Sequence, residues 1–336
     1  SGKYPKKFEE KYKELQPEKY KDTIEHVIKK GNTPAGMHIS IMVNEILDFL
    51  KIQPGETGFD ATLGYGGHTK AMLQCLKGQG HIYATDVDPE ESARTRKRLE
   101  EAGFGEDILT IRLQNFCTID EIAKEAGGFD FILADLGVSS MQIDNPKRGF
   151  SFKVDGPLDL RLNQEAGISA AERLAAITKD ELAGMLYENS DEPYCEELAK
   201  AITDEIRKGN RIDTTTKLRN IIEKTLDFLP EKEKKDTIKK TCQRTFQALR
   251  IDVNREFEVL YEFMEKLPDA LKPGGRAAIL TFHSGEDKLV KKALKEGYRA
   301  GIYADYAKDV IRPSAQECAQ NGRARSTKMR WAIKAE

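Results

Sequence analysis

The feature of this sequence that most restricts its fold is a glycine-dense segment between a strand-like and a helix-like stretch. Residues 60–68 read DATLGYGGH, and the first of them ends the strand-like stretch 57–60. Glycine has no Cβ and tolerates positive φ, so such a turn lets the backbone come close to a ligand. The segment therefore predicts the first strand–turn–helix unit of an α/β sheet with a ligand site at the turn.

An acidic residue follows at a spacing that suits an adenosine-containing ligand. Asp86 lies nineteen positions after Gly67, at the end of a second strand-like stretch, where a carboxylate can accept hydrogen bonds from both ribose hydroxyls. Thr69 occupies the third small-residue position of a GxGxxG motif, which disfavours a pyrophosphate-containing dinucleotide. Together with Asp60 and the turn at 271–275, this pattern favours S-adenosylmethionine and a class I methyltransferase. A nicotinamide dehydrogenase is the alternative, and it predicts NAD binding instead.

Alternation of strands and helices extends beyond this unit. Strand-like stretches recur at 81–87, 108–116, 129–137 and 274–282, whereas amphipathic helical patterns fill the stretch from about 145 to 243. We expect an α/β fold, a Rossmann-like doubly wound sheet with an inserted all-helical domain. The expected parts are a charged N-terminal extension (1–33), a methyltransferase domain (34–144 and 244–336) and a helical insertion domain (145–243).

Composition limits the remaining classes of function. No apolar run reaches the roughly 18 residues of a membrane-spanning helix, so no membrane partner is expected. The five cysteines are scattered without a CxxC pair, which predicts no metal site, no disulfide framework and a cytoplasmic location. The net charge of −2 disfavours a protein that coats nucleic acid without preference, although RNA binding depends on local clusters.

Several further motifs occur in a recognisable order. They are DLGVSSMQ at 135–142, RGFSF at 148–152, DGPLDLR at 155–161, RTFQALRI at 244–251 and FHSGED at 282–287. From about His38 to the C-terminus, the chain resembles the bacterial ribosomal-RNA cytosine-N4 methyltransferases of the MraW/RsmH family. The resemblance implies S-adenosyl-L-methionine-dependent methylation of the exocyclic N4 of a cytosine in small-subunit (16S) ribosomal RNA. It also implies ribosomal RNA or the small ribosomal subunit as partner.

The same resemblance implies which residues form the site. The cofactor-binding residues by position are Gly66, Gly67, His68, Asp86, Phe116, Asp135 and Gln142. The amine of cytosine is a poor nucleophile, so a polar residue must orient it and accept its hydrogen bond. Our candidates for catalytic roles are Asp135, His283 and Glu286. A structural role for His283 and a core position for Phe116 are the competing interpretations.

RNA contacts are expected from aromatic and basic residues. Phe150 or Phe152 could stack on a flipped base or belong to the core of the insertion. Basic residues with a plausible phosphate-binding role are Lys147, Arg148, Arg244, Arg250, Arg323, Arg325, Lys328 and Arg330. The alternation in residues 323–330 predicts an edge strand with one basic face.

Three positions depart from the pattern of the resembled family. Tyr65 stands in place of Arg, Met141 in place of Pro, and Gly285 in place of Leu. The segment between the FHSGED motif and the C-terminal basic stretch is also shorter than usual. These departures leave open a paralogue that methylates a different RNA nucleotide. A non-catalytic, cofactor-binding ribosome assembly factor and a homodimeric arrangement are also left open by the residues.

Overall fold

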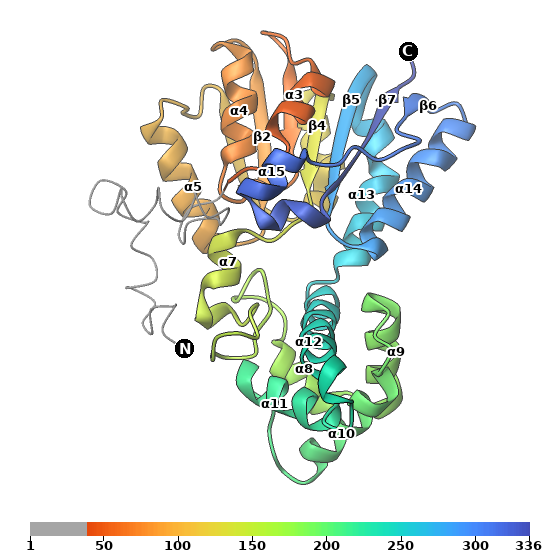
Figure 1. The fold of residues 1–336 in the computed structure, drawn as a ribbon. Helices are drawn as coiled ribbons and strands as arrows, with labels where there is room; N and C mark the ends of the chain where they lie inside the picture. The colour runs from red at the N-terminus through yellow and green to blue at the C-terminus, as the bar shows by residue number, and fades with distance from the viewer. Residues whose placement is uncertain (1–38) are drawn as a thin grey trace. The chain divides into compact units, whose positions relative to one another are not determined.

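The computed structural model of the protein describes residues 39–336, so the expected extension 1–33 lies outside the described residues. The described chain forms two compact units (Figure 1). The first comprises the residues up to Ser140 together with Phe257–Glu336, and the second comprises Met141–Glu256. None of the described helices is long and apolar enough to cross a membrane.

A mixed seven-stranded sheet forms the centre of the first unit. Its strand order is β3-β2-β1-β4-β5-β7-β6, in which β1 to β5 are parallel and β7 is antiparallel to both of its neighbours. Because β1 lies between β2 and β4, the strand order reverses there, and the carboxyl ends on either side define a crevice for ligands. The strands are β1 (Thr57–Asp60), β2 (His81–Asp86), β3 (Leu109–Leu113), β4 (Phe129–Asp135), β5 (Leu271–Thr281), β6 (Tyr303–Tyr306) and β7 (Lys328–Lys334).

Helices cover both faces of this sheet, as the doubly wound pattern predicts (Figure 1). One apolar cluster centres on Met72, Leu73 and Phe131, and another on Phe59, Phe129 and Phe263. The near-continuous apolar run of β4 is buried on both faces, as expected for a central parallel strand. The helices of this unit are α3 (Val43–Leu50), α4 (Gly67–Leu76), α5 (Pro89–Glu101), α6 (Ile119–Ala126), α13 (Glu256–Ala270), α14 (Ser284–Arg299) and α15 (Ala315–Gln320), with the short 3-10 turns η2 (Phe116–Thr118) and η4 (Gly322–Ser326).

The turn expected at residues 271–275 is part of β5, where it forms an irregularity in the pairing with β4. Phe129 pairs with Leu271, whereas Phe131 pairs with Arg276. A bulge of this kind inserts extra residues into one strand. A Cβ on Gly275 would lie 2.8 Å from the carbonyl oxygen of Lys272, so glycine lets the bulge fold back on itself.

The basic C-terminal segment differs from the expected edge strand. Residues 322–326 form η4, and β7 lies between β5 and β6 rather than at an edge. The guanidinium of Arg330 is buried and makes two hydrogen bonds to the carboxylate of Asp287, at 2.7 and 2.9 Å. The prediction of an exposed basic face on this strand is therefore wrong, because pairing with β6 covers the edge and an acid neutralises Arg330.

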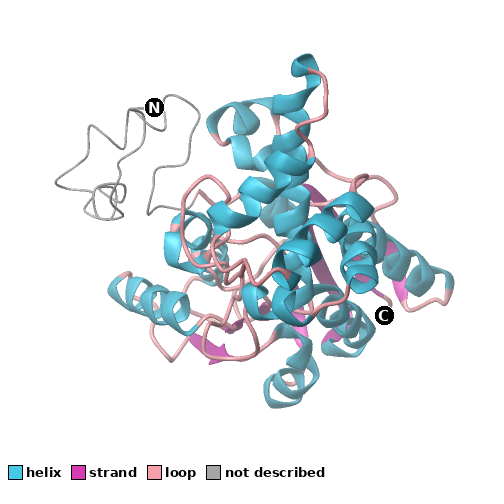
Figure 2. Cartoon of the chain, turned by 90° about the horizontal axis from the view of Figure 1, so that it is seen from below, coloured by secondary structure: helices cyan, strands magenta, loops and turns pink. Residues whose placement is uncertain are grey.

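The second unit, which the structure describes throughout, contains helices and loops but no strand (Figures 1 and 2). Both α8 and α9 begin with a capping box, in which Ser169 or Thr178 and a glutamate three residues later cap each other's backbone N–H groups. The helices are α7 (Ser140–Asp144), which starts at the end of the first unit, α8 (Ala170–Ala176), α9 (Lys179–Ser190), α10 (Cys195–Arg207), α11 (Thr215–Thr225) and α12 (Glu231–Val253), with the 3-10 turn η3 (Pro146–Arg148).

The unit boundaries follow helix continuity. The boundary expected at 243 falls inside α12, which continues without interruption to Val253. Phe246 and Leu249, beyond that expected boundary, are buried in the core of the second unit. The chain therefore returns to the first unit only after the end of α12.

Candidate active site

The glycine turn between β1 and α4 has the backbone geometry that its sequence predicts. Gly64 and Gly66 have φ values of +52° and +90°, which only glycine adopts without strain. A Cβ on Gly66 would lie 2.6 Å from Cγ2 of Thr95, and one on Gly67 would lie 1.8 Å from Oγ of Ser40. Glycine is therefore required here both for conformation and for close contact with neighbouring segments.

Asp60, the last residue of β1, supports this turn. Its carboxylate is fully buried and accepts hydrogen bonds from Oγ1 of Thr69, at 2.5 Å, and from the backbone N–H of Thr62, at 3.0 Å. Burial raises the pKa of Asp60, whereas the hydrogen bond from Thr69 and the nearby His68 lower it. Because Thr69 lies in the first turn of α4, Asp60 fixes the start of that helix to the end of β1.

Asp86 holds the same turn from β2. One carboxylate oxygen accepts a hydrogen bond from the N–H of Gly64 at 3.1 Å, and the other accepts one from the N–H of Asp88 at 3.0 Å. Burial raises the pKa of Asp86 to about 6, although both of these hydrogen bonds oppose the shift. A carboxylate has about four acceptor positions, so these hydrogen bonds leave room for a hydroxyl donor.

His68, which is buried, and Asp135, which is partly buried, form a pair between α4 and the end of β4. Nε2 of His68 lies 2.7 Å from the carbonyl oxygen of Ile41, and Nδ1 lies 3.5 Å from Oδ2 of Asp135. Burial raises the pKa of Asp135, and the adjacent His68 opposes that shift. The backbone N–H of Asp135 donates to Oγ1 of Thr62 at 2.7 Å. This places Asp135 next to the segment that precedes the glycine turn.

Phe116 lies in η2, after β3, and is only partly buried. Its ring meets the ring of Phe263 edge to face, with centroids 5.2 Å apart and an interplanar angle of 88°. One edge of the ring thus packs in the apolar cluster that includes Phe263. This geometry is compatible with both interpretations of Phe116, core packing and stacking on adenine, because the ring is anchored in the core and still partly exposed.

His283 and Glu286 lie together at the carboxyl end of β5, where α14 begins. Nδ1 of His283 accepts a hydrogen bond from the N–H of Glu286 at 3.4 Å, and Nε2 lies 3.5 Å from Oε1 of the same residue. That carboxylate oxygen also accepts from the N–H of Phe282 at 2.9 Å. Glu286 is buried, so its first role is to hold the turn that carries His283.

The turns after β4 and β5 adjoin each other. The N–H of Leu136 donates to the carbonyl oxygen of Leu280, at 3.2 Å, one residue beyond the paired positions Asp135 and Leu280. A Cβ on Gly137 would lie 2.9 Å from the ring of Phe282. Register and contact thus bring the segment after Asp135 against the segment that leads to His283.

Residues on α5 that the sequence did not single out support the same edge. Oγ1 of Thr95 donates to the carbonyl oxygen of Gly64, and Arg98 donates to the carbonyl oxygen of Tyr65 at 3.1 Å. The guanidinium carbon of Arg98 also lies 3.9 Å from the centroid of the Tyr65 ring. Glu91 is buried and accepts from Oγ of Ser139 at 3.1 Å. The i, i+4, i+7 spacing of these three α5 residues was the available signal.

Gln142 and the aromatic residues of the RGFSF motif belong to the second unit. Gln142 is buried in α7, and its cofactor-binding role stays a prediction. Phe150 and Phe152 both pack against the helical core of this unit, and Phe152 lies 5.8 Å from the ring of Phe246. The core interpretation of these two phenylalanines is therefore supported by their contacts.

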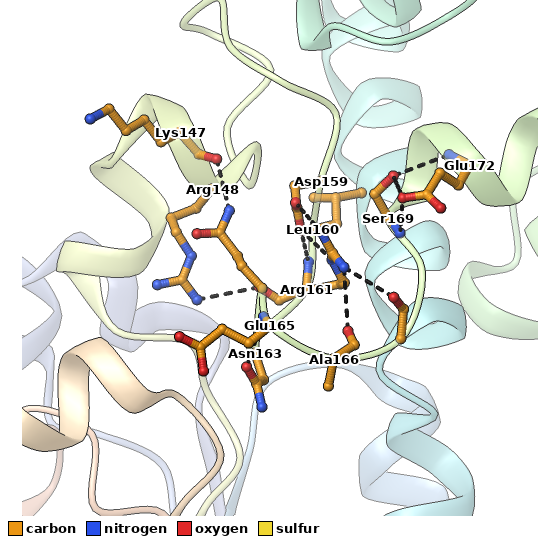
Figure 3. Close-up of polar contacts among 12 residues, drawn as sticks. Lys147, Arg148, Asp159, Leu160, Arg161, Asn163, Glu165, Ala166, Ser169 and Glu172 are labelled. Atoms are coloured by element: carbon orange, nitrogen blue, oxygen red, sulfur yellow. Dashed lines mark hydrogen bonds and ion pairs between the residues drawn. The ribbon is translucent and has the colours of Figure 1, made fainter.

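The side chains of Arg148 and Arg161, near Phe150, are held in a network of loop hydrogen bonds (Figure 3). Arg148 is buried, and its guanidinium donates to the carbonyl oxygens of Leu162, at 2.6 Å, and Arg161, at 3.3 Å. Arg161 in turn makes two hydrogen bonds to the carboxylate of Asp159. Arg148 is thus a poor phosphate ligand, because the side chain is buried and its Nη2 group already donates to two backbone oxygens. Lys147, whose side chain is exposed, keeps that role as a prediction.

Two other expected phosphate contacts also have protein partners. Arg250 makes two hydrogen bonds to Glu256, at 2.9 and 3.2 Å, and Arg244 lies 3.5 Å from a buried carboxylate oxygen of Glu192.

All five cysteines are free. The described residues contain no group of three or more His, Cys, Asp and Glu side chains that could hold a metal ion.

Comparison with known proteins identifies the class to which this site belongs. Residues 35–335 match the model of the MraW methylase family, which covers almost the whole chain. The chain therefore belongs to the MraW methylase family, as its motifs had indicated. As a member of this methylase family, it uses S-adenosylmethionine as methyl donor, which fits the glycine turn and the carboxylate of Asp86.

Individual relatives carry a more specific name. A protein of Agathobacter rectalis, "Ribosomal RNA small subunit methyltransferase H 1", is 88% identical over 336 residues, covering 100% of this chain and 96% of the relative. A protein with the same name from Lachnoclostridium phytofermentans is 71% identical, covering 99% and 91%. "Ribosomal RNA small subunit methyltransferase H" of Koribacter versatilis is 36% identical over 302 residues, covering 88% and 94%.

Proposed function

We propose that this methyltransferase modifies the exocyclic N4 amine of a cytosine in small-subunit ribosomal RNA. Membership of the MraW methylase family and the names of its relatives support the RNA substrate. Methylation of an amine is supported by the position of Asp135, whose carboxylate lies at the carboxyl end of β4 beside the glycine turn. This substrate implies the small ribosomal subunit as partner and the cytoplasm as location.

The first unit offers groups that suit each part of the cofactor. Gly66 and Gly67 let the turn pack closely against Thr95 and Ser40, which fixes the backbone that faces the cofactor in this proposal. Asp86 is held by two N–H groups in a position to accept the ribose hydroxyls. The partly exposed ring of Phe116 is available for stacking on adenine. We assign His68 a supporting role, because its two ring nitrogens face Ile41 and Asp135.

The bound cofactor supplies an electrophilic sulfonium methyl group, and the protein must supply orientation and a proton acceptor. The lone pair of the cytosine amine is delocalised into the ring, so an acceptor for its N–H increases the electron density on nitrogen. In our proposal the carboxylate of Asp135 accepts this hydrogen bond. Burial raises the pKa of Asp135, which makes its carboxylate a better acceptor for the proton that N4 loses.

His283 and Glu286 serve the opposite wall of the site in this proposal. Glu286 holds the Phe282 N–H and caps the turn, and His283 presents its ring from that turn. We assign His283 to contact with the base or its ribose, and Glu286 to positioning of His283. Contact through His283 agrees with its location after β5, beside the turn that follows Asp135.

Mass mapping of modified nucleotides in small-subunit RNA tests this function directly. RNA from cells that lack the gene should have no N4-methylcytosine at one position, and the purified protein with S-adenosylmethionine should restore it. Loss of a different modification would contradict the cytosine-N4 assignment while leaving RNA methylation in place.

A different target nucleotide is the second candidate, and one observation favours it. Gly285 replaces the Leu of the resembled family, and the ring of Phe257 lies where that side chain would begin, 2.7 Å from the position of a Cβ. The wall that carries His283 therefore has a different shape. The same mass mapping separates the two candidates, because it identifies both the nucleotide and the modified atom.

A further inference from the structure

Helix α14 carries five cations along one face. Lys288, Lys291, Lys292, Lys295 and Arg299 are spaced i, i+3, i+4, i+7 and i+11, which places them in a single stripe. At 1.5 Å per residue the stripe is about 16 Å long. Four of the five side chains are exposed, and Lys295 is partly exposed. We call these five residues the α14 stripe.

Acidic side chains do not neutralise this stripe. Within residues 39–336, no ion pair involves any of its five cations. Two of the three acids of α14 are engaged elsewhere, because Glu286 caps its own turn and Asp287 is paired with Arg330. The third, Glu296, forms no ion pair with the stripe among the described residues. The helix thus presents positive charge although the whole chain has a net charge of −2.

Several lysines on the helices of the second unit differ from those of the stripe. Lys200 pairs with Asp204, Lys217 with Asp213, and Lys240 with Asp236, each four residues apart on its helix. Such pairs are typical of a solvated helix face, where neighbouring charges balance each other. The α14 stripe lacks these partners, so solubility alone is a poor explanation for its charge pattern.

The position of the stripe connects it to the candidate active site. Helix α14 begins at Ser284, directly after β5 and His283, and packs along β6 and β7 (Figure 1). Lys288 is one turn from that start, and Arg299 is at the far end of the helix. The stripe therefore leads away from the edge of the sheet at which the methyl group would be transferred.

An exposed aromatic ring accompanies the far end of the stripe. Tyr298 is 39% exposed, and its ring centroid lies 5.0 Å from that of Tyr306 and 5.7 Å from Nζ of Lys308. A row of phosphate-binding cations that ends at an aromatic ring is a combination used for single-stranded nucleic acid, because any base can stack on the ring.

We propose that the α14 stripe and Tyr298 form a binding track for the phosphate backbone of the RNA substrate, outside the reaction centre. This inference rests on the proposed RNA substrate and names a surface that recognises it. The stripe supplies charge without sequence preference, whereas the target base is selected at the site. Its function is to hold a flanking strand while the target nucleotide enters.

The test compares two triple variants of the full-length protein. Lys291→Gln, Lys292→Gln and Lys295→Gln remove the centre of the stripe. Lys77→Gln, Lys97→Gln and Lys124→Gln remove three exposed lysines, directly after α4 and on α5 and α6, that likewise have no ion pair among the described residues. Binding to an unmodified small-subunit RNA transcript is measured between about 50 and 200 mM salt, the range in which phosphate contacts change affinity steeply.

Each lost phosphate contact should reduce the slope of log affinity against log salt by about 0.7 to 0.9, so the stripe triple should lose about 2 units of slope. Its affinity should fall by about tenfold or more at low salt. The control triple should match the wild type, and replacement of the same three stripe lysines by Arg should retain the slope. Tyr298→Ala should lower affinity without changing the slope, whereas Tyr298→Phe should not.

Binding of S-adenosylhomocysteine, measured by calorimetry, should be equal in all variants and shows that each is folded. Equal slopes for the two triples would overturn the inference, as would no binding of wild-type protein to the transcript. A loss of binding that occurs only with assembled small subunits would indicate a protein partner and would also overturn it. If the slope falls as expected but the wild type methylates no ribosomal RNA, the proposed function fails and the RNA track remains.

Discussion

The two sides of the candidate active site are stabilised in different ways. On the glycine-turn side, residues from β2 and α5 contact the turn: Asp86 binds the N–H of Gly64, Thr95 binds its carbonyl oxygen, and Arg98 binds the carbonyl oxygen of Tyr65. On the β5 side, Glu286 makes hydrogen bonds within its own turn, to His283 and Phe282, and the ring of Phe257 packs against that of His283. The glycine turn is therefore held by hydrogen bonds from other elements, whereas the β5 turn combines hydrogen bonds within itself with packing against Phe257 and Gly137.

This difference suggests a division of labour. A turn fixed by two neighbouring elements cannot change shape without disturbing both of them, which suits a cofactor common to many enzymes. A turn that is held partly by the packing of side chains such as Phe257 can accept a substitution at Gly285 if those side chains adjust. Substitutions on the two sides should consequently separate cofactor affinity from methyl transfer to RNA.

The largest effect is expected at Asp135, which lies between the two sides. Asp135→Ala should reduce methyl incorporation from labelled cofactor by about 10²–10⁴-fold, because it removes the proposed acceptor for the amine proton. Asp130→Asn changes a carboxylate at the opposite end of the same strand, where it binds the N–H of Thr57, and serves as control. Activity of Asp135→Ala near that of the control would show that Asp135 does not act on the substrate.

A smaller effect is expected at Asp86, and it should fall on cofactor binding. Asp86→Asn weakens the proposed hydrogen bonds to the ribose hydroxyls and those from the N–H groups of Gly64 and Asp88, so the Kd for S-adenosylhomocysteine should increase about 10–100-fold. Calorimetry provides the measurement, with the exposed Asp107→Asn as control. An unchanged Kd would remove Asp86 from the cofactor site and weaken the contrast between the two sides.

Local patterns in the sequence predict the cofactor side well. The five parallel strands, the glycine turn and the position of Asp86 depend on periodicity and spacing within short segments. In the structure the five strands form one sheet, and the glycine turn and Asp86 meet at the carboxyl ends of its strands. Such features can be predicted because each is encoded within a few consecutive residues.

Other features depend on contacts between distant segments, and sequence patterns missed them. The segment 323–330 was expected at an edge, but pairing with β6 places β7 inside the sheet. Thr95 and Arg98 belong to a highly charged helix that resembles a solvated surface, yet both bind the glycine turn. The burial of Arg148 likewise depends on a loop that no local pattern describes.

A stability effect of moderate size is expected from restoring the leucine of the resembled family on the β5 side. Gly285→Leu forces the ring of Phe257 to move, because even a Cβ would lie 2.7 Å from it. Overpacking of this kind costs about 1–3 kcal/mol, measurable by denaturant unfolding. Gly285→Leu should cost less stability in a Phe257→Ala background than in the wild type if the ring of Phe257 alone limits the space. An equal cost in both backgrounds would mean that other residues also limit the space at Gly285.

The smallest effect is a dependence of cofactor affinity on pH through Asp86. Burial raises the pKa of its carboxyl to about 6, so at pH 5.5 only about a quarter of the molecules carry the carboxylate that binds ribose. Affinity for S-adenosylhomocysteine should thus fall about fourfold between pH 7.5 and 5.5, and Asp86→Asn should not show this fall.

Stability should change in the opposite direction. The folded-state pKa of Asp86 is above its unfolded value, so the folded protein binds the proton more tightly, and the carboxylate destabilises it above about pH 6. As the pH falls from 7.5 toward 5, the wild type should therefore gain stability relative to Asp86→Asn. If affinity for S-adenosylhomocysteine and stability relative to Asp86→Asn both fell with pH, a group other than Asp86 would be responsible for the change in affinity.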